Sequence, residues 1–204
     1  MKTTIPRFEF RIFGLSLDQY ESKLKEISEV EKTRHMTSIY LLTAGNTTNN
    51  IKIREGVMDI KELEQKHKGL EQWSPFLVGE FPLKTDIIRT VVFPAMGIES
   101  PVFERDEYTL EQLLNEVICN DPDLAVAFVK KTRYAYTVSK CITEIAEVTI
   151  NGAYMKTLCI EHEDPERVLK AKKKLGIGED VENVNYPLAL KRVMGLAELP
   201  ESWK

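Results

Sequence analysis

The feature that most constrains this chain is a set of short runs in which charged residues stand two positions apart. Successive side chains of a β-strand point to opposite faces, so residues i and i+2 share one face of a sheet. Each run therefore predicts a strand with paired charges on one side. Two runs are basic, one is acidic and one is mixed: Arg7-Phe8-Glu9-Phe10-Arg11, Lys52-Ile53-Arg54, Lys131-Thr132-Arg133 and Glu161-His162-Glu163. A sheet that closes around these faces would enclose a charged lumen, which suits a polyanion held with a divalent metal.

Length and composition set broader limits. A chain of 204 residues predicts one domain over 1–204, with a mainly helical segment at about 84–122. The net charge of −4 argues against a general nucleic-acid-binding protein. No apolar run reaches membrane-spanning length and the first residues carry no apolar leader, so we expect a cytoplasmic protein without a membrane partner. The three cysteines follow no zinc-site spacing and are expected to be free thiols.

Periodicity predicts a fold of class α+β. Apolar–polar alternation and β-branched runs indicate seven or eight strands, at about 6–13, 37–43, 51–55, 57–63, 76–82, 124–138, 141–150 and 155–162. Asn151-Gly152 predicts a hairpin between the last two. Helical spacing indicates helices at about 17–28, 85–96, 109–118, after 164 and at 187–194. Most strands neighbour each other in sequence, so the sheet is expected to be antiparallel; whether the helices at 85–118 cover an opening of the sheet or only support it stays open.

The order of the charged motifs resembles that of the CYTH superfamily, also called triphosphate tunnel metalloenzymes. The resemblance runs over nearly the whole chain: Glu9 and Arg11, then Lys52 and Arg54, Lys61, Lys131 and Arg133, Glu144 or Glu147, Glu161 and Glu163, and finally Asn183-Val184-Asn185-Tyr186 before the last helix. Each motif alone also fits the solvated face of an ordinary strand. Six of them in the family's order favour a common lumen.

The resemblance implies a fold and a set of roles. The fold is an eight-stranded antiparallel β-barrel, or tunnel, with flanking helices, and the chemistry is cleavage or rearrangement of a triphosphate with Mg²⁺ or Mn²⁺. The side chains expected to bind the substrate phosphates are Arg11, Lys52, Arg54, Lys61, Lys131 and Arg133, with Lys61, Lys131 and Arg133 as the catalytic contacts. The side chains expected to hold the metal are Glu9, Glu147, Glu161 and Glu163.

The choice of Glu147 over Glu144 follows from strand parity. The two glutamates lie an odd number of residues apart, so a regular strand turns only one of them inward. Glu147 shares its face with Thr143 and Thr149. The opposite face would then pack outward against helices with its apolar residues Ala146, Val148 and Ile150.

One departure from the family pattern divides the functional hypotheses. The first glutamate of the family's ExExK motif is Arg7 here, and its terminal lysine is Arg11. The leading hypothesis is a metal-dependent phosphohydrolase acting on inorganic triphosphate, polyphosphate, or a nucleoside or thiamine triphosphate; cyclisation of ATP is less favoured. The rival is a non-catalytic module that binds polyphosphate or a nucleotide. The sequence leaves open the substrate and the oligomeric state, a homodimer included.

Overall fold

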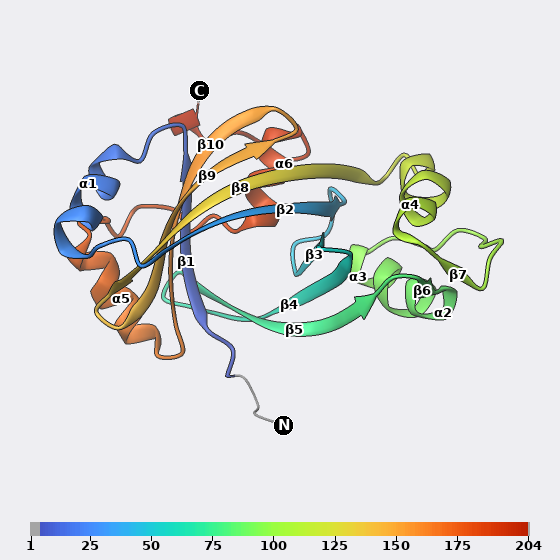
Figure 1. Cartoon of the computed structure of the whole chain (residues 1–204), viewed down its shortest axis with the longest axis horizontal. Coiled ribbons are helices and arrows are strands. Elements are labelled where there is room, and N and C mark those ends of the chain that lie inside the picture. The colour runs from blue at the N-terminus through green and yellow to red at the C-terminus, as the bar shows by residue number, and fades with distance from the viewer. Residues whose placement is uncertain (1–4, 204) are drawn as a thin grey trace.

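The computed structural model describes residues 5–203, so positions 1–4 and 204 of the expected domain lie outside the described residues. Its centre is a closed, antiparallel barrel of eight strands, which confirms the predicted fold (Figure 1). In barrel order these are β1 (Phe8–Gly14), β10 (Ala153–His162), β9 (Cys141–Ile150), β8 (Ala125–Val138), β2 (Lys32–Leu42), β3 (Asn49–Arg54), β4 (Val57–His67) and β5 (Leu70–Glu80). No helix among residues 5–203 is both long and apolar enough to cross a membrane.

Two hairpins show how local sequence sets the strand boundaries. Asn151 (φ 46°) and Gly152 (φ 96°) join β9 to β10, as the Asn-Gly pair predicts. Lys68 (φ 48°) and Gly69 (φ 78°) form a second turn of this kind between β4 and β5. The sequence prediction missed this hairpin and began the strand at 76, because the run Glu64-Gln65-Lys66-His67 is polar throughout and shows no alternation.

The outer face of one side of the barrel is covered by two helices, α1 (Asp18–Ile27) and α5 (Pro165–Lys174), which lie on the left of Figure 1. Phe8, Phe10 and Ile12 of β1 point outward and pack into a buried cluster with Leu24 of α1 and Val168 of α5. These three residues alternate with the charged residues of β1. The same alternation that makes the lumen charged therefore anchors the helices outside.

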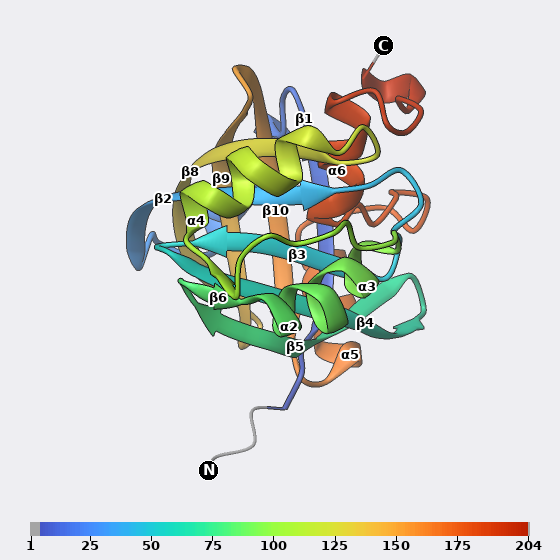
Figure 2. The ribbon, with the colours of Figure 1, turned by 90° about the vertical axis from the view of Figure 1, so that its right-hand side faces the viewer.

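The segment between β5 and β8 contains most of the remaining helix. It comprises β6 (Leu83–Lys84), α2 (Thr85–Ile87), the π-helical turn η1 (Ile88–Val92), α3 (Phe93–Met96), β7 (Glu107–Tyr108), α4 (Leu110–Gln112), the π-helical turn η2 (Leu113–Val117) and the 3₁₀ turn η3 (Ile118–Asn120). Ile88 and Phe93 pack with Ile51, Ile53 and Ile60. In Figure 2 these helices lie in front of β3 and β4. Since Ile51 and Ile53 alternate with the lumen residues of β3, the helices support the barrel wall from outside.

A third apolar cluster fills part of the barrel interior. The last helix, α6 (Tyr186–Val193), packs with Ala189 and Leu190 against Tyr40, Val129 and Val148. These strand residues lie on the same face of their strands as the charged side chains that point into the lumen farther along. The interior is thus divided into a charged half and an apolar half, and α6 closes the apolar half. After α6, the 3₁₀ turn η4 (Glu201–Trp203) lies near the end of the chain.

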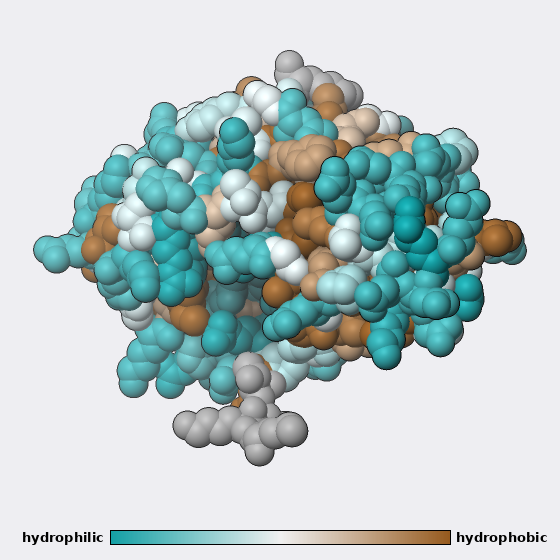
Figure 3. All heavy atoms as spheres, turned by 45° about the vertical axis from the view of Figure 1, so that its right-hand side comes forward, coloured by the Kyte–Doolittle hydropathy of each residue, from teal (hydrophilic) through white to brown (hydrophobic). Residues whose placement is uncertain are grey.

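The outer surface is more hydrophilic than the three buried clusters. On the face shown in Figure 3, hydrophilic side chains cover most of the molecule, and hydrophobic residues show between them in small groups. The large apolar side chains are accordingly concentrated in the three buried clusters.

Candidate functional site

The charged half of the interior contains a cavity of about 300 Å³. Among residues 5–203, eight basic side chains and three carboxylates line it, although the whole chain carries a net charge of −4. The basic side chains are Arg7, Arg11, Arg34, Lys52, Arg54, Lys61, Lys131 and Arg133, and the carboxylates are Glu9, Glu144 and Glu161. All six of the basic residues predicted from the motifs therefore meet in one cavity. Such a concentration of positive charge inside low-dielectric walls favours a polyanion.

Glu144 of β9 lies at the centre of the buried charges. Its carboxylate accepts hydrogen bonds from Arg11 Nη1 at 3.0 Å, Lys131 Nζ at 2.6 Å and Arg133 Nε. Burial alone would raise the pKa of Glu144, but Lys131 and Arg11 outweigh it and hold that pKa well below its ordinary value. The carboxylate is therefore a fixed anion that positions the three cations.

The preference for Glu147 as the inward-facing glutamate is wrong. Glu147 lies on the outer surface of the barrel, in a shallow hollow beside His35 and Tyr154. The reason is that α6 enters the barrel, so Ala146 and Val148 face inward and pack against it. Apolar residues on this strand mark the closed half of the interior, and Glu144 shares their parity.

Glu9 and Glu161 form the acidic part of the cavity. They are register partners on β1 and β10. Glu9 Oε1 accepts a hydrogen bond of 2.8 Å from Arg11 Nε, and Glu161 Oε2 lies 3.4 Å from Arg7 Nη1. Burial works to raise the pKa of Glu9, yet Arg11 shifts it below the ordinary value. The ionised carboxylate of Glu9 is thus placed beside that of Glu161.

These carboxylates fit a hard divalent cation. Ligand atoms of Glu9, Glu161 and Cys159 lie within 4.8 Å of one another. Mg²⁺ is commonly held by one or two carboxylates together with substrate phosphates and water. Cys159 is the poorest of the three donors, because burial raises the pKa of its thiol well above the ordinary value. The donor set that fits is therefore the carboxylate pair.

Glu163 does not reach this cluster. The strand β10 ends at His162, and Glu163 is an exposed residue in the bend before α5. The i, i+2 rule that placed it beside Glu161 holds only within a regular strand. The prediction of Glu163 as a lumen residue is therefore wrong.

The opposite wall of the cavity is formed by β3 and β4. Lys52 is buried, and its Nζ lies 2.8 Å from Asp59 Oδ2 on the neighbouring strand. Burial, opposed by Asp59, lowers the pKa of Lys52 to about 8. Lys61 and Arg54 line the same wall. The cations on this side of the cavity could pair with a bound anion.

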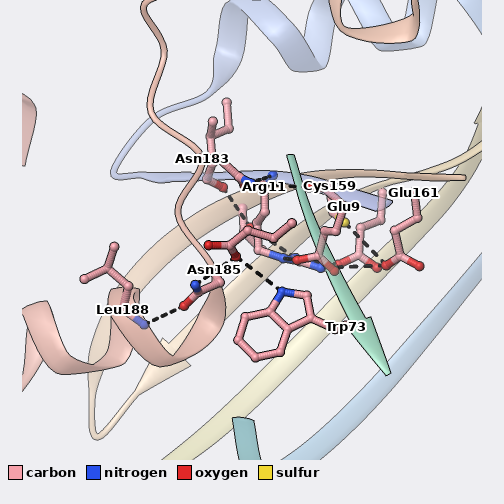
Figure 4. A network of polar contacts seen from close by, with 12 residues as sticks. Glu9, Arg11, Trp73, Cys159, Glu161, Asn183, Asn185 and Leu188 are labelled. Carbon is pink, nitrogen blue, oxygen red and sulfur yellow. Dashed lines mark hydrogen bonds and ion pairs between the residues drawn. The ribbon is translucent and has the colours of Figure 1, made fainter. Parts of the chain in front are cut away.

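The segment before α6 is tied to the barrel by a polar network (Figure 4). Asn183 accepts a hydrogen bond from the backbone N–H of Arg11 at 2.8 Å and donates one to the carbonyl of Gly69 at 3.0 Å. Asn185 caps α6 by accepting from Leu188 N at 2.9 Å, and its amide donates to Glu71 at 2.9 Å. The network fixes the first turn of α6 at the cavity, so the next residue, Tyr186, lines it.

Several residues that line the cavity were not among the predicted site residues, although two of them, Asn185 and Tyr186, stand in the motif before the last helix. These residues are Arg34, Met36, Ser38, Tyr40, Asn50, Trp73, Val129, Asn185 and Tyr186. Arg34 was missed because β2 was predicted from 37, whereas it begins at Lys32. The sequence does contain a pattern that could have identified Arg34, since it lies an even number of residues from Tyr40 and so shares its face of the strand. Trp73 was missed with the β4–β5 hairpin.

Comparison with known proteins gives a likeness of fold. No family model matches the chain, and no curated protein matches it. A conserved hypothetical protein from Pyrococcus furiosus aligns over 90% of this chain and 99% of its own, with 18% identity and a TM-score of 0.50. The PH1012 protein from Pyrococcus horikoshii aligns over 89% and 97%, with 16% identity and a TM-score of 0.50.

A third solved structure is HpAC1 from Hippeastrum, described as a putative adenylyl cyclase with a dominant triphosphatase activity. It aligns over 96% of this chain and 98% of its own, with 14% identity and a TM-score of 0.49. At such identities the two Pyrococcus structures show similarity of fold alone. The chain has the closed eight-stranded antiparallel barrel that its resemblance to the CYTH superfamily implied.

Proposed function

We propose that this protein is a metal-dependent phosphohydrolase that holds a triphosphate-bearing small molecule inside its barrel. One observation carries the proposal: eight basic side chains converge on a cavity of about 300 Å³ that also contains a carboxylate pair. A phosphate chain needs several cations along its length, and few other ligands match such a lining. The ordered CYTH-like motifs support the same substrate class.

The basic residues would bind and orient the phosphate chain. Lys131 and Arg133 come from β8, while Lys52 and Lys61 come from the opposite wall, so the two sets would contact the chain from both sides. Phosphoryl transfer depends mainly on such positioning and on stabilising charge in the transition state. In the reaction, a water oxygen bonds to the terminal phosphorus as the bridging P–O bond breaks; the leaving oxygen keeps the electron pair and solvent takes the water proton.

Glu9 and Glu161 are the residues that would hold Mg²⁺ or Mn²⁺. When bound, the ion supplies charge neutralisation at phosphate oxygens. Arg7 and Arg11 already contact these carboxylates, so the same two arginines would contact the phosphate that enters beside them.

The test is phosphate release from inorganic triphosphate, ATP, GTP and thiamine triphosphate, each with Mg²⁺ and with Mn²⁺, followed by thermal shift on the same samples. We expect turnover of at least one compound, and we expect Lys131→Ala to abolish it. Lys130→Ala is the matched control, because Lys130 is the exposed neighbour on the outer face of β8. Turnover that survives Lys131→Ala would contradict the proposal.

A second candidate function is binding without hydrolysis, and the position of Arg7 favours it. Arg7 stands where the family has a metal-binding glutamate, and its guanidinium contacts Glu161. A cation at that place competes with a metal ion for the same carboxylate. Thermal stabilisation by the panel without phosphate release under either metal would support this candidate over the hydrolase.

A further inference from the structure

Three buried polar atoms point to a ligand that completes the cavity. In the part of the chain that the structure describes, Tyr186 Oη, Asn50 Oδ1 and Arg54 Nε are buried and have no hydrogen-bond partner. They come from different parts of the fold, α6 and β3, yet all three residues line the same cavity. Leaving a buried polar group unpaired costs about 1–3 kcal/mol, so native proteins rarely retain it without a reason.

Tyr186 has the most informative surroundings of the three. It is 8% exposed and lies where the charged half of the interior meets the apolar half. On the apolar side its ring packs edge-on against Phe13, with centroids 5.0 Å apart, and stacks on Tyr40 at 5.7 Å. On the charged side Arg11 and Lys131 lie 4.8 Å and 5.2 Å from the ring centroid.

The apolar contacts account for the ring of Tyr186 but leave its hydroxyl unexplained. A phenylalanine would keep the contacts to Phe13 and Tyr40 without burying a polar group. The two cations beside the ring belong to the buried part of the anion-binding wall, since Arg11 is only 5% exposed and Lys131 14%. The hydroxyl on this ring is an unpaired donor in the cavity that these cations also line, where a bound anion would lie.

We propose that Tyr186 is a substrate-binding residue whose hydroxyl donates a hydrogen bond to the terminal phosphate of the ligand. Phe13 and Tyr40 pack against the ring of Tyr186 at the border of the apolar half of the interior, so the group that reaches Tyr186 would be the end of the phosphate chain. The cavity therefore selects compounds with a free terminal phosphate. This inference rests on the proposed function, because it names a further contact and a ligand class for the same cavity.

The test is the affinity of the full chain for inorganic tripolyphosphate, measured by calorimetry for the wild type and Tyr186→Phe. A hydrogen bond to a charged group corresponds to a loss of about tenfold or more in affinity. The melting temperature of Tyr186→Phe without ligand is expected to equal or exceed that of the wild type, because the hydroxyl has no hydrogen-bond partner among the described residues. Tyr134→Phe on the outer face of β8 is the matched control, expected to change neither quantity.

Each outcome is decisive. An affinity of Tyr186→Phe within twofold of the wild type overturns the role of Tyr186, and if Lys131→Met still loses binding, the proposed function stands. No binding of tripolyphosphate by the wild type overturns the role of Tyr186, and the proposed function falls with it if ATP, GTP and thiamine triphosphate also show no turnover. A capped ligand, P1,P3-diadenosine triphosphate, is expected to bind at least tenfold more weakly than tripolyphosphate; equal affinity contradicts the selection for a free end.

Discussion

Arg11 Nη1 lies 3.0 Å from Glu144 Oε1, and each of the two side chains is only 5% exposed. A buried ion pair of this kind is costly to break, because removing one partner leaves the other as an uncompensated buried charge. Here the carboxylate also pairs with Lys131 and Arg133. Glu144 is thus the anion on which Arg11, Lys131 and Arg133 converge.

Replacing that anion gives the first prediction. Glu144→Gln is expected to lower the free energy of unfolding by about 3–5 kcal/mol at pH 7, since buried cations lose their partner. The pKa of Glu144 is lowered in the folded state, so its contribution is present above the ordinary value of 4.5 and is lost as the pH falls below it. Urea unfolding at pH 7 and pH 3 should therefore show a smaller pH effect in the variant.

The control for this change is Glu26→Gln, because Glu26 is an exposed residue paired with exposed Lys23. It should shift stability by less than about 0.5 kcal/mol at either pH. Identical acid sensitivity in Glu144→Gln and the wild type would exclude the central role of this carboxylate.

Lys52 predicts how anion binding responds to alkaline pH. Burial lowers the pKa of Lys52 to about 8, so this lysine loses its charge as the pH rises through that value. A phosphate chain requires the charged form, and affinity for tripolyphosphate should therefore fall above pH 8. Calorimetry from pH 6.5 to 9.5 should show this fall in the wild type and in Lys23→Met, and a flatter profile in Lys52→Met. An unchanged profile in Lys52→Met would place the titration elsewhere.

Arg7 predicts a gain of metal binding. Arg7→Glu replaces a cation 3.4 Å from Glu161 with a third carboxylate, which should raise Mn²⁺ affinity by about tenfold or more because ligand charge controls such sites. Arg167→Glu is the matched control, since Arg167 has the same 43% exposure and pairs only with Asp164 at an exposed site. Calorimetric titration with Mn²⁺ measures the metal affinity of both variants. Equal gains in the two would mean that the change in net charge, and not a third metal ligand, causes the effect.

Asn185 predicts that the segment before α6 positions the site. Asn185→Ala removes the cap of α6, worth about 1 kcal/mol, and the hydrogen bond to Glu71, worth about 1.5–3 kcal/mol. We expect lower stability and weaker binding of tripolyphosphate. Asn185→Ser keeps the capping oxygen and separates the two contributions. If both variants bind the anion as the wild type does, the segment has no positioning role.

Regular alternation and strands that neighbour each other along the chain predicted an antiparallel sheet, and the resemblance to the CYTH superfamily implied that this sheet closes into a barrel. Parity was sufficient to bring Arg11, Lys52 and Lys131 to one cavity. It failed where a strand ended sooner or began earlier than the pattern indicated: Glu163 follows the end of β10, and Arg34 precedes the predicted start of β2. Strand boundaries depend on partners that are distant in sequence, which alternation alone does not reveal.

The error at Glu147 has a different origin. It assumed that apolar residues of a barrel strand always face the outer helices, but those of β9 face α6 inside the barrel. The entry of a helix into the lumen depends on tertiary packing, and no local sequence pattern in β9 predicts it. Tyr186 was noted only as the end of the motif before the last helix, because its place in the cavity depends on how α6 packs against the barrel.

The helices that pack on the outside of the barrel wall have a consequence for how such a protein can change. Two of the three buried apolar clusters, those around Leu24 and Phe93, lie on the far side of the strands from the cavity. Side chains that only line the cavity, such as Met36 and Ser38, contribute little to either cluster. Substitutions there can alter the shape and charge of the chamber without weakening its wall, so this scaffold can acquire new specificities by single changes that selection for stability would not oppose.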